Sequence, residues 1–140
     1  MSPVGFATPE DAEAAFYAAF ERGDVDAMMT VWADDDQAIV CVHPRGAVLA
    51  GRQAVKQSWQ TIFAHSPGLK FRIAPQLQTL DSHLAIHVVH EHIRLSGEER
   101  RQHTVIATNA YRRTATGWRM VLHHASPAAA TGDTQPATLH

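Results

Sequence analysis

Residues 102–124 read QHTVIATNAYRRTATGWRMVLHH, and this stretch decides the class of fold. Its two halves alternate apolar and polar residues with the period of two that is typical of β-strands. Strands are therefore expected at 102–113 and 118–124, joined by a turn short enough for a hairpin. A third strand is expected at 84–95, one short polar stretch upstream. Together the three strands predict an antiparallel meander.

Helical patterns precede the meander. Thr8 and Pro9 supply a hydroxyl cap and a proline at the first helical position, and apolar residues then recur at three- and four-residue spacing up to Gly23. Gly23 suits a left-handed helix end, and Asp24 can cap a second, shorter helix. A third amphipathic helix is expected after Gly51.

Two further strands flank the third helix. A short apolar run at 38–42 ends at turn residues, and residues 69–73 alternate until Pro75 interrupts them. The proline suits an edge strand or a bulge. Helices followed by a mostly antiparallel sheet predict an α+β domain.

Composition narrows the function classes. The 140 residues supply one domain, expected at 1–127, and the Ala, Thr, Gly and Pro composition of 128–140 predicts a disordered tail. No stretch approaches the roughly 18 apolar residues of a membrane-spanning helix, and no signal peptide is recognisable, so a cytoplasmic protein without membrane contact is expected. A net charge of −2 without a basic block argues against nucleic acid as a partner. Ten histidines are the one unusual feature.

The chain resembles the SnoaL-like branch of the nuclear transport factor 2-like superfamily over residues 8–126. The residues that carry the resemblance are Trp32-Ala33-Asp34-Asp35-Asp36, Val42-His43-Pro44-Arg45-Gly46, Gly51-Arg52, Ser58-Trp59, Ile62-Phe63, Thr108-Asn109, Tyr111-Arg112, Gly117-Trp118-Arg119 and His123-His124-Ala125-Ser126. The resemblance implies a cone-shaped fold, in which a curved sheet wraps around the helices and leaves an apolar pocket, and a homodimer formed through the outer sheet face. The same fold serves ketosteroid isomerases, polyketide cyclases, dehydratases, epoxide hydrolases and non-catalytic association domains, so fold alone does not decide function.

Strand alternation assigns side chains to the two faces of the sheet. With Arg113 and Trp118 flanking the turn, His124 falls on the pocket face and His123 on the outer face. The face expected to line the pocket comprises Val105, Ala107, Asn109, Tyr111, Trp118, Met120, Leu122 and His124.

The preceding hairpin depends on its register. Pairing Leu95 with Gln102 directs His90 and His92 into the pocket and Glu91 outward, and a slip of one residue reverses this. We favour the first register, because burying a lone carboxylate is costly.

The leading hypothesis is a small-molecule-binding protein that performs acid–base chemistry on an apolar cyclic or enolisable substrate. His124 or His90 would abstract a proton, and Asn109 or Tyr111 would stabilise an oxyanion. The residues expected to contact the ligand are His43, Trp59, His92, Tyr111 and Met120. For each candidate the alternative is core packing or a structural hydrogen bond. Whether the protein is an enzyme stays open, because the related isomerases and cyclases use a pocket carboxylate that the favoured register does not supply.

The alternative hypothesis is a non-catalytic association domain, like that of calcium/calmodulin-dependent kinase II. It would assemble through the outer sheet face, with Ile106, Ala110 and Val121. His90 and His92 have a spacing that permits a shared metal ion, but such spacing arises readily by chance among ten histidines. No metal or cofactor is therefore expected.

Overall fold

The computed structural model describes residues 5–34, 37–65, 68–95, 97 and 102–129. Three helices and six strands follow one another as α1 (Pro9–Arg22), α2 (Val25–Val31), β1 (Val40–Val42), β2 (Leu49–Ala50), α3 (Arg52–His65), β3 (Leu69–Leu80), β4 (Leu84–Leu95), β5 (Gln102–Thr114) and β6 (Gly117–Pro127). The predicted α+β fold is confirmed. Of the expected disordered tail, residues 130–140 lie outside the described residues.

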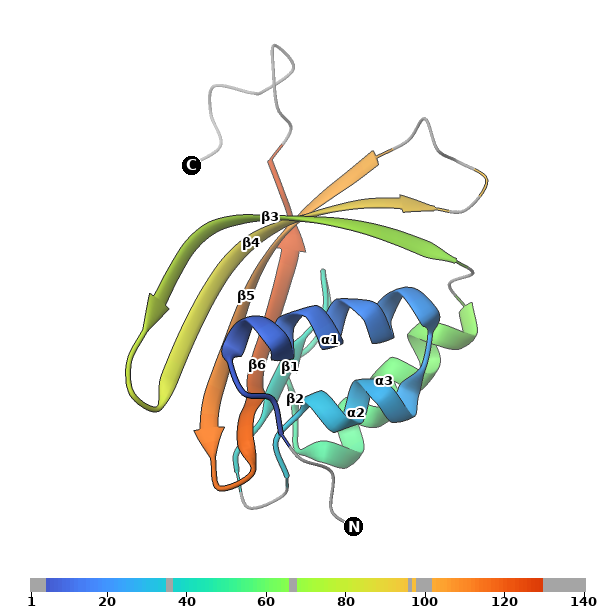
Figure 1. Ribbon diagram of the computed structural model, residues 1–140. Helices are drawn as coiled ribbons and strands as arrows, with labels where there is room; N and C mark the ends of the chain where they lie inside the picture. The colour runs from blue at the N-terminus through green and yellow to red at the C-terminus, as the bar shows by residue number, and fades with distance from the viewer. Residues whose placement is uncertain (1–4, 35–36, 66–67, 96, 98–101, 130–140) are drawn as a thin grey trace.

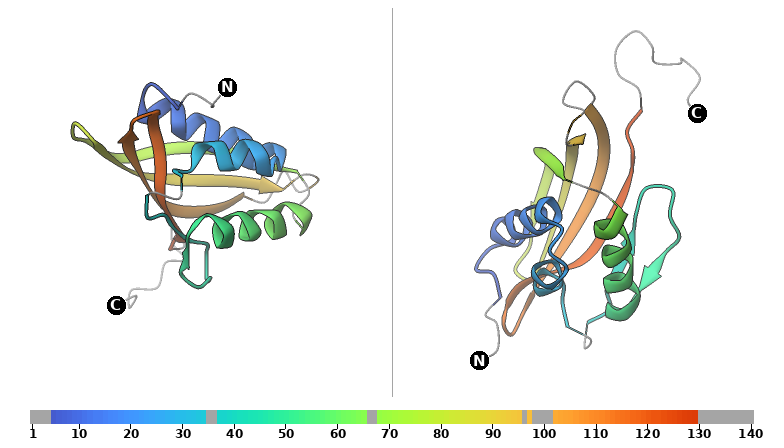
Figure 2. Two further views of the ribbon diagram at one scale, coloured as in Figure 1. Left: turned by 90° about the horizontal axis from the view of Figure 1, so that it is seen from below. Right: turned by 90° about the vertical axis from the view of Figure 1, so that its right-hand side faces the viewer.

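The strands form one sheet in the order β2-β1-β6-β5-β4-β3. Only β1 and β6 run parallel among these pairs, and β3 to β6 form the predicted antiparallel meander. The sheet is strongly curved, and the three helices lie within its curve (Figures 1 and 2). No helix in the described ranges has both the length and the apolar character needed to cross a bilayer.

The ends of α1 and α2 form as their sequence predicts. Thr8 Oγ1 accepts a hydrogen bond from the Asp11 amide at 3.0 Å, and Gly23 ends α1 in the left-handed conformation with φ 64°. Asp24 Oδ1 accepts a hydrogen bond from the Ala27 amide at 3.0 Å and so begins α2. These local caps determine where α1 begins and ends and where α2 begins, independently of tertiary contacts.

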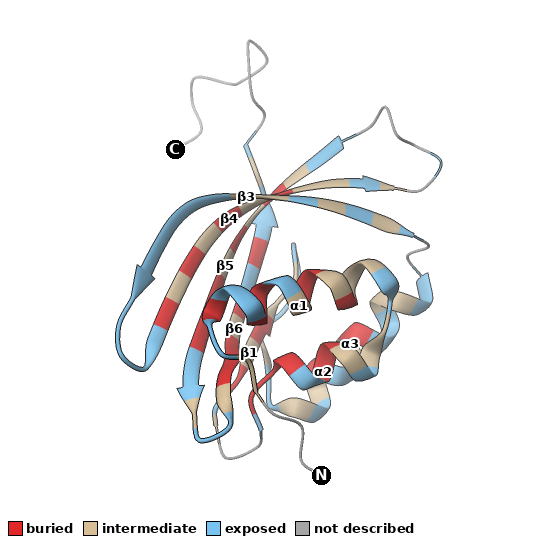
Figure 3. Cartoon of the chain, in the orientation of Figure 1, coloured by how far each residue is buried: buried red, intermediate tan, exposed pale blue. Residues whose placement is uncertain are grey.

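The core lies between the helices and the concave face of the sheet, where buried residues alternate along the strands (Figure 3). Phe16 and Trp59 are fully buried and contact each other edge to face, with ring centroids 5.6 Å apart. Tyr111 and Met120 are also fully buried on the sheet side. Each such side chain contributes about 1.5–3 kcal/mol through burial of apolar surface.

A β-bulge in β6 corrects one predicted face. Tyr111 pairs with Met120 as expected, but Ala110 pairs with Leu122, so Val121 is an extra residue. Because the side-chain period of a strand is two, this insertion exchanges the faces of all later residues. His123 is therefore buried, His124 is exposed, and the prediction that His124 faces the interior is wrong.

The β4–β5 hairpin corrects the other predicted face. Gln102 pairs with Arg94 and not with Leu95, which shifts the register by one residue. Glu91 is consequently 2% exposed on the concave face. His90 and His92 lie on the outer face, so the prediction that they face the pocket is wrong.

Arg52 ties α3 to the end of α2, and this contact gives a first prediction. Its guanidinium donates hydrogen bonds to the carbonyl oxygens of Met29, Trp32 and Ala33 at 3.1, 3.2 and 2.8 Å. Replacing Arg52 by methionine should lower the free energy of unfolding by about 1.5–3 kcal/mol, because charge-assisted bonds to orphan helix carbonyls are lost. Urea denaturation measures the change.

Lys56→Met provides the matched control, one turn later on α3 at an exposed position. It should change stability by less than about 0.5 kcal/mol. Equal losses in the two variants would contradict the role of Arg52.

Candidate functional site

Seven polar side chains meet between α1 and the concave face, and we call them the interior polar cluster. They come from α1, β4, β5 and β6, and each is at most 8% exposed. Its members are Glu13, Tyr17, His87, Glu91, Asn109, Tyr111 and His123.

Spacing within each element brings these side chains together. Glu13 and Tyr17 are four residues apart on α1 and so share a helix face. His87 and Glu91 are four residues apart on β4, an even number that places both on the concave face. His87 pairs with Asn109 across β4 and β5, which aligns the two strands under α1.

Glu13 is the acceptor at the centre of the cluster. Its Oε2 accepts hydrogen bonds from Tyr111 Oη at 2.8 Å, His87 Nδ1 at 3.0 Å and Asn109 Nδ2 at 3.3 Å. Burial alone would raise the pKa of Glu13, but these bonds and the charge of His87 outweigh it and hold the pKa below its ordinary value. Glu13 is therefore ionised at neutral pH.

His87 links Glu13 to the surface. Its Nε2 lies 3.5 Å from Oε2 of Glu10, a largely exposed residue, while Nδ1 faces Glu13. Burial lowers the pKa of His87, but the hydrogen bond and charge of Glu13, together with the charge of Glu10, raise it above the ordinary value overall. In its protonated form the imidazole is a counter-ion for the Glu13 carboxylate.

Glu91 is a second carboxyl with a different environment. Its Oε2 accepts a hydrogen bond from Tyr17 Oη at 2.6 Å, whereas Oε1 has no hydrogen bond to the described residues. Burial raises the pKa of Glu91 to about 7, the negative charge of Glu13 adds to this, and the Tyr17 bond opposes it. Two neighbouring carboxyls whose surroundings shift their pKa values in opposite directions are one arrangement that supports acid–base chemistry.

Asn109 joins the two carboxyls. Its Nδ2 also donates to Tyr17 Oη at 3.0 Å, and its Oδ1 accepts a hydrogen bond from His123 Nδ1 at 2.6 Å. Burial, with the charges of His43 and His124, lowers the pKa of His123 to about 3, so its ring is neutral. Asn109 and Tyr111 lie inside the cone, as strand alternation indicates, and their roles toward a ligand stay predictions.

The predicted contact residues His43, Trp59 and Met120 also lie on the interior side. His43 Nε2 is 2.9 Å from Ser58 Oγ, and its ring contacts Trp59 edge to face at 4.7 Å. Burial lowers the pKa of His43. Trp59 and Met120 are fully buried in the core. Whether any of these contacts a ligand stays a prediction.

The predicted residues His90, His92 and His124 are separated from this cluster by the sheet. His92 Nδ1 lies 3.1 Å from Thr104 Oγ1 on the outer face. Although the rings of His90 and His92 are 5.9 Å apart, the described residues contain no group of three or more His, Cys, Asp or Glu side chains that could hold a metal ion.

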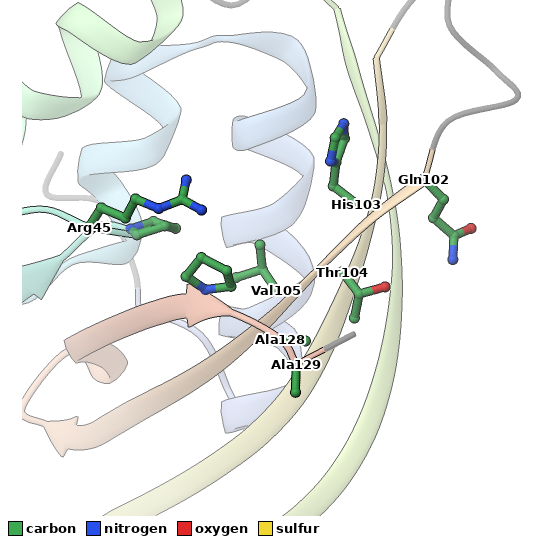
Figure 4. Close-up of a pocket in the computed structure, with 9 residues that line it drawn as sticks. Arg45, Gln102, His103, Thr104, Val105, Ala128 and Ala129 are labelled. Atoms are coloured by element: carbon green, nitrogen blue, oxygen red, sulfur yellow. The ribbon is translucent and has the colours of Figure 1, made fainter. Parts of the chain in front are cut away.

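A surface pocket of about 420 Å³ lies near the end of the sheet where β4 ends and β5 begins, which we call the β4–β5 end. Figure 4 shows Arg45 and Val105 on one side of β5, with Gln102 and Thr104 on the other. Val105 pairs directly with Glu91, so the pocket wall lies beside the strand position of this carboxyl. The residues that line the pocket are Pro44, Arg45, Gln102, His103, Thr104, Val105, Pro127, Ala128 and Ala129.

Sequence reasoning did not place five members of the cluster in the interior, namely Glu13, Tyr17, His87, Glu91 and His123. The spacing of Glu13 and Tyr17 next to the apolar face of α1 was an available signal. The register of β4 on β5 that places Glu91 on the concave face also places His87 there. Nothing local in the sequence marks the bulge that turns His123 inward.

Comparison with known proteins identifies the family. The model of the SnoaL-like domain matches residues 10–130. A Thiobacillus denitrificans protein, described as a candidate calcium/calmodulin-dependent protein kinase type II association domain, is 44% identical with a TM-score of 0.83, covering 91% of this chain and 99% of that one. A Streptomyces avermitilis protein, described as a candidate dehydratase of the nuclear transport factor 2-like family, is 34% identical with a TM-score of 0.78, covering 85% and 92%.

More distant relatives share the fold or part of their length. A ketosteroid isomerase-like protein from Erwinia carotovora atroseptica is 17% identical, with a TM-score of 0.68 and coverage of 86% and 94%, which shows the fold alone. F-box protein SKIP8 of Arabidopsis thaliana is 24% identical over 79% of this chain, and the chain spans 46% of that protein.

The raised pKa of Glu91 predicts a specific pH dependence of stability. Because the folded pKa of about 7 exceeds the ordinary 4.5, the stabilising contribution of the protonated carboxyl is complete below pH 4.5 and is lost as the pH rises through 7. Glu91→Gln removes this titration, so native protein should lose on the order of 3 kcal/mol more than the variant between these pH values. Urea denaturation across this range measures it.

A carboxyl ¹³C titration by NMR provides the control. Glu91 should titrate near pH 7 and Glu13 below its ordinary value. An ordinary midpoint for Glu91, with parallel stability curves for the two proteins, would contradict its buried environment.

Proposed function

Because the chain belongs to the SnoaL-like family, we propose that it binds an apolar small molecule at the β4–β5 end of the cone and that Glu91 transfers a proton to or from it. The observation that carries this proposal is the Glu91 carboxyl, which is nearly fully buried and has a pKa of about 7. Its Oε1 accepts no hydrogen bond from a described residue. A base with a pKa near the working pH is the most effective proton-transfer group.

The surroundings of Glu91 support an apolar substrate. Its pairing partners are Ile73 on β3 and Val105 on β5, and Phe71 and Ile93 form the next pair along the same face. Phe71, Ile73 and Ile93 are only partly buried, which leaves apolar surface beside the carboxyl. Pockets with mainly apolar walls and few polar groups bind apolar ligands through burial and orient them through the polar group.

The two carboxyls of the cluster have different roles in the proposed proton transfer. Glu13 has three donors on one oxygen and a pKa held below its ordinary value, so it remains a fixed negative charge. That charge favours the protonated form of Glu91 and makes its ionised form a stronger base. Tyr17 holds the Glu91 carboxyl in position through one oxygen. The class of substrate that fits is an apolar cyclic or enolisable carbonyl compound.

Hydrogen–deuterium exchange at the α-carbon of apolar cyclic ketones tests this function. Native protein in D₂O should catalyse exchange, with a rate that rises with pH through about 7 as Glu91 ionises. Glu91→Gln should lower the rate by about 10²-fold or more, since general-base catalysis contributes 10²–10⁴-fold. Ligand affinity should change far less than the rate. NMR measures exchange, and thermal shift measures binding.

His90→Gln is the matched control, because His90 is adjacent to Glu91 in the chain but lies on the opposite face of the sheet. Exchange in this variant should equal that of native protein. Loss of exchange in His90→Gln with full activity in Glu91→Gln would overturn the assignment, as would the absence of exchange and of any ketone-dependent thermal shift in native protein.

Self-association is a second candidate function. The outer sheet face carries Ile86, Val88, Ile106 and Leu122, and the Thiobacillus denitrificans relative named for an association domain is 44% identical. Ile86 and Leu122 both pair with Ala110, and Val88 and Ile106 belong to the next two rows of paired residues on the same face, which together form one strip. Such a strip fits the isologous interface of a homodimer.

Ile106→Glu tests the homodimer, because it places a charge on this strip, on β5, the central one of its three strands. Native protein should sediment as a dimer and the variant as a folded monomer, since a buried unpaired carboxylate opposes association. Gln57→Glu adds the same charge to an exposed position of α3 and should leave the dimer intact. A monomeric native protein would exclude this candidate.

A further inference from the structure

Positive charge gathers on the outer face at the β4–β5 end of the sheet. Lys70 and Arg72 on β3 pair directly with Arg94 and His92 on β4. Two pairs that follow each other on the outer face therefore place cationic or protonatable side chains opposite each other. Like charges at directly paired positions destabilise a sheet, so fold stability does not account for this arrangement.

The cations at this end have no acidic partner in the described part of the chain. Among the described residues, the basic members of the ion pairs are Arg22 and His87. Lys70, Arg72 and Arg94 take part in none of these pairs. All three side chains are exposed. Their charges are thus available to an anion from solution.

The same residues line a cleft of about 220 Å³, distinct from the larger pocket whose wall includes Val105. Among the residues that the structure describes, those lining the cleft carry no carboxylate. They are Lys70, Phe71, Arg72, His92, Arg94 and Gln102.

His92 adds a neutral donor to the cleft. Gln102 Nε2 lies 3.2 Å from His92 Nδ1, and because an amide nitrogen can only donate, Nδ1 accepts this bond. The proton of the neutral ring is therefore on Nε2. Burial and the charges of Arg72 and His90 lower the pKa of His92, which favours this neutral form.

We propose that this cleft, formed by Lys70, Arg72, Arg94 and His92, binds a phosphate group. Arginine presents a planar fork that matches phosphate oxygens bidentately, and lysine supplies a compact charge. Bound phosphate would offset the repulsion between the paired cations. The phosphate is either free inorganic phosphate or the monoester of a small molecule. This site does not depend on acid–base chemistry at Glu91, which acts on the other face.

NMR and calorimetric titrations of the full chain with inorganic phosphate and with glycerol phosphate, at constant ionic strength, test the site. Both anions should shift the amide signals of His92 and Thr104 with a saturable curve. Arg72→Gln and Arg94→Gln should each weaken binding by about tenfold or more, since each removes charge-assisted hydrogen bonds. Tighter binding of glycerol phosphate identifies a phosphorylated small molecule, and equal binding identifies free phosphate; both support a phosphate site.

Arg112→Gln is the matched control, because it removes one exposed positive charge at the other end of β5. It should bind phosphate as native protein does, and so should Glu91→Gln, which separates this proposal from the acid–base function. Arg94→Gln should also unfold at the same temperature as native protein or a higher one, because it relieves repulsion.

Three outcomes would overturn the proposal. Native protein could fail to bind either anion at millimolar concentration. Arg112→Gln could weaken binding as much as Arg72→Gln, which would mean general charge attraction. Binding could occur only in the monomeric Ile106→Glu variant, which would mean that a second copy covers the cleft.

Discussion

The buried carboxylate of Glu13 is the constraint on which the rest of the interior depends. An ionised carboxylate inside a protein requires donors, and Glu13 obtains them from Tyr111, His87 and Asn109 on two strands. These bonds join residues 74 to 98 positions apart in the chain. They hold α1 against the concave face and require one register of β4 on β5, since a slip of one residue would turn His87 outward.

The register of β4 shows where sequence reasoning succeeds and where it stops. A lone buried carboxylate is costly, but Glu91 is not alone, because Tyr17 on α1 donates a hydrogen bond to it. The partner lies 74 residues away, so no local pattern announces it. Caps, helical periodicity and strand alternation are local, and the elements that they predict are confirmed. Face assignments rest on pairing, which is not local.

The bulge at Val121 is a second feature of strand pairing that local sequence patterns do not predict. The β5–β6 hairpin is paired as predicted from its turn as far as Tyr111 and Met120, and one inserted residue then exchanges the faces of His123 and His124. The identity of the buried histidine is therefore set by a single backbone irregularity. The prediction that Asn109 and Tyr111 lie in the interior is confirmed, because β5 carries no insertion where it pairs with β4.

The unequal hydrogen bonding of the two carboxyls is the reason that we propose proton transfer at Glu91 and not at Glu13. A carboxyl with only a structural role would be stabilised by several hydrogen-bond donors, as Glu13 is. At position 91, glutamine could keep the contact with Tyr17 without the cost of burying a charge. Glu91 instead retains an ionisable group with one donor, in apolar surroundings and beside a negative charge that makes its ionisation harder still. Strongly perturbed carboxyls of this kind concentrate at functional sites, because the free energy that they cost the fold becomes reactivity toward a ligand. A pKa of about 7 leaves Glu91 divided between its protonated and ionised forms at neutral pH, and this supports the proton transfer that we propose for it.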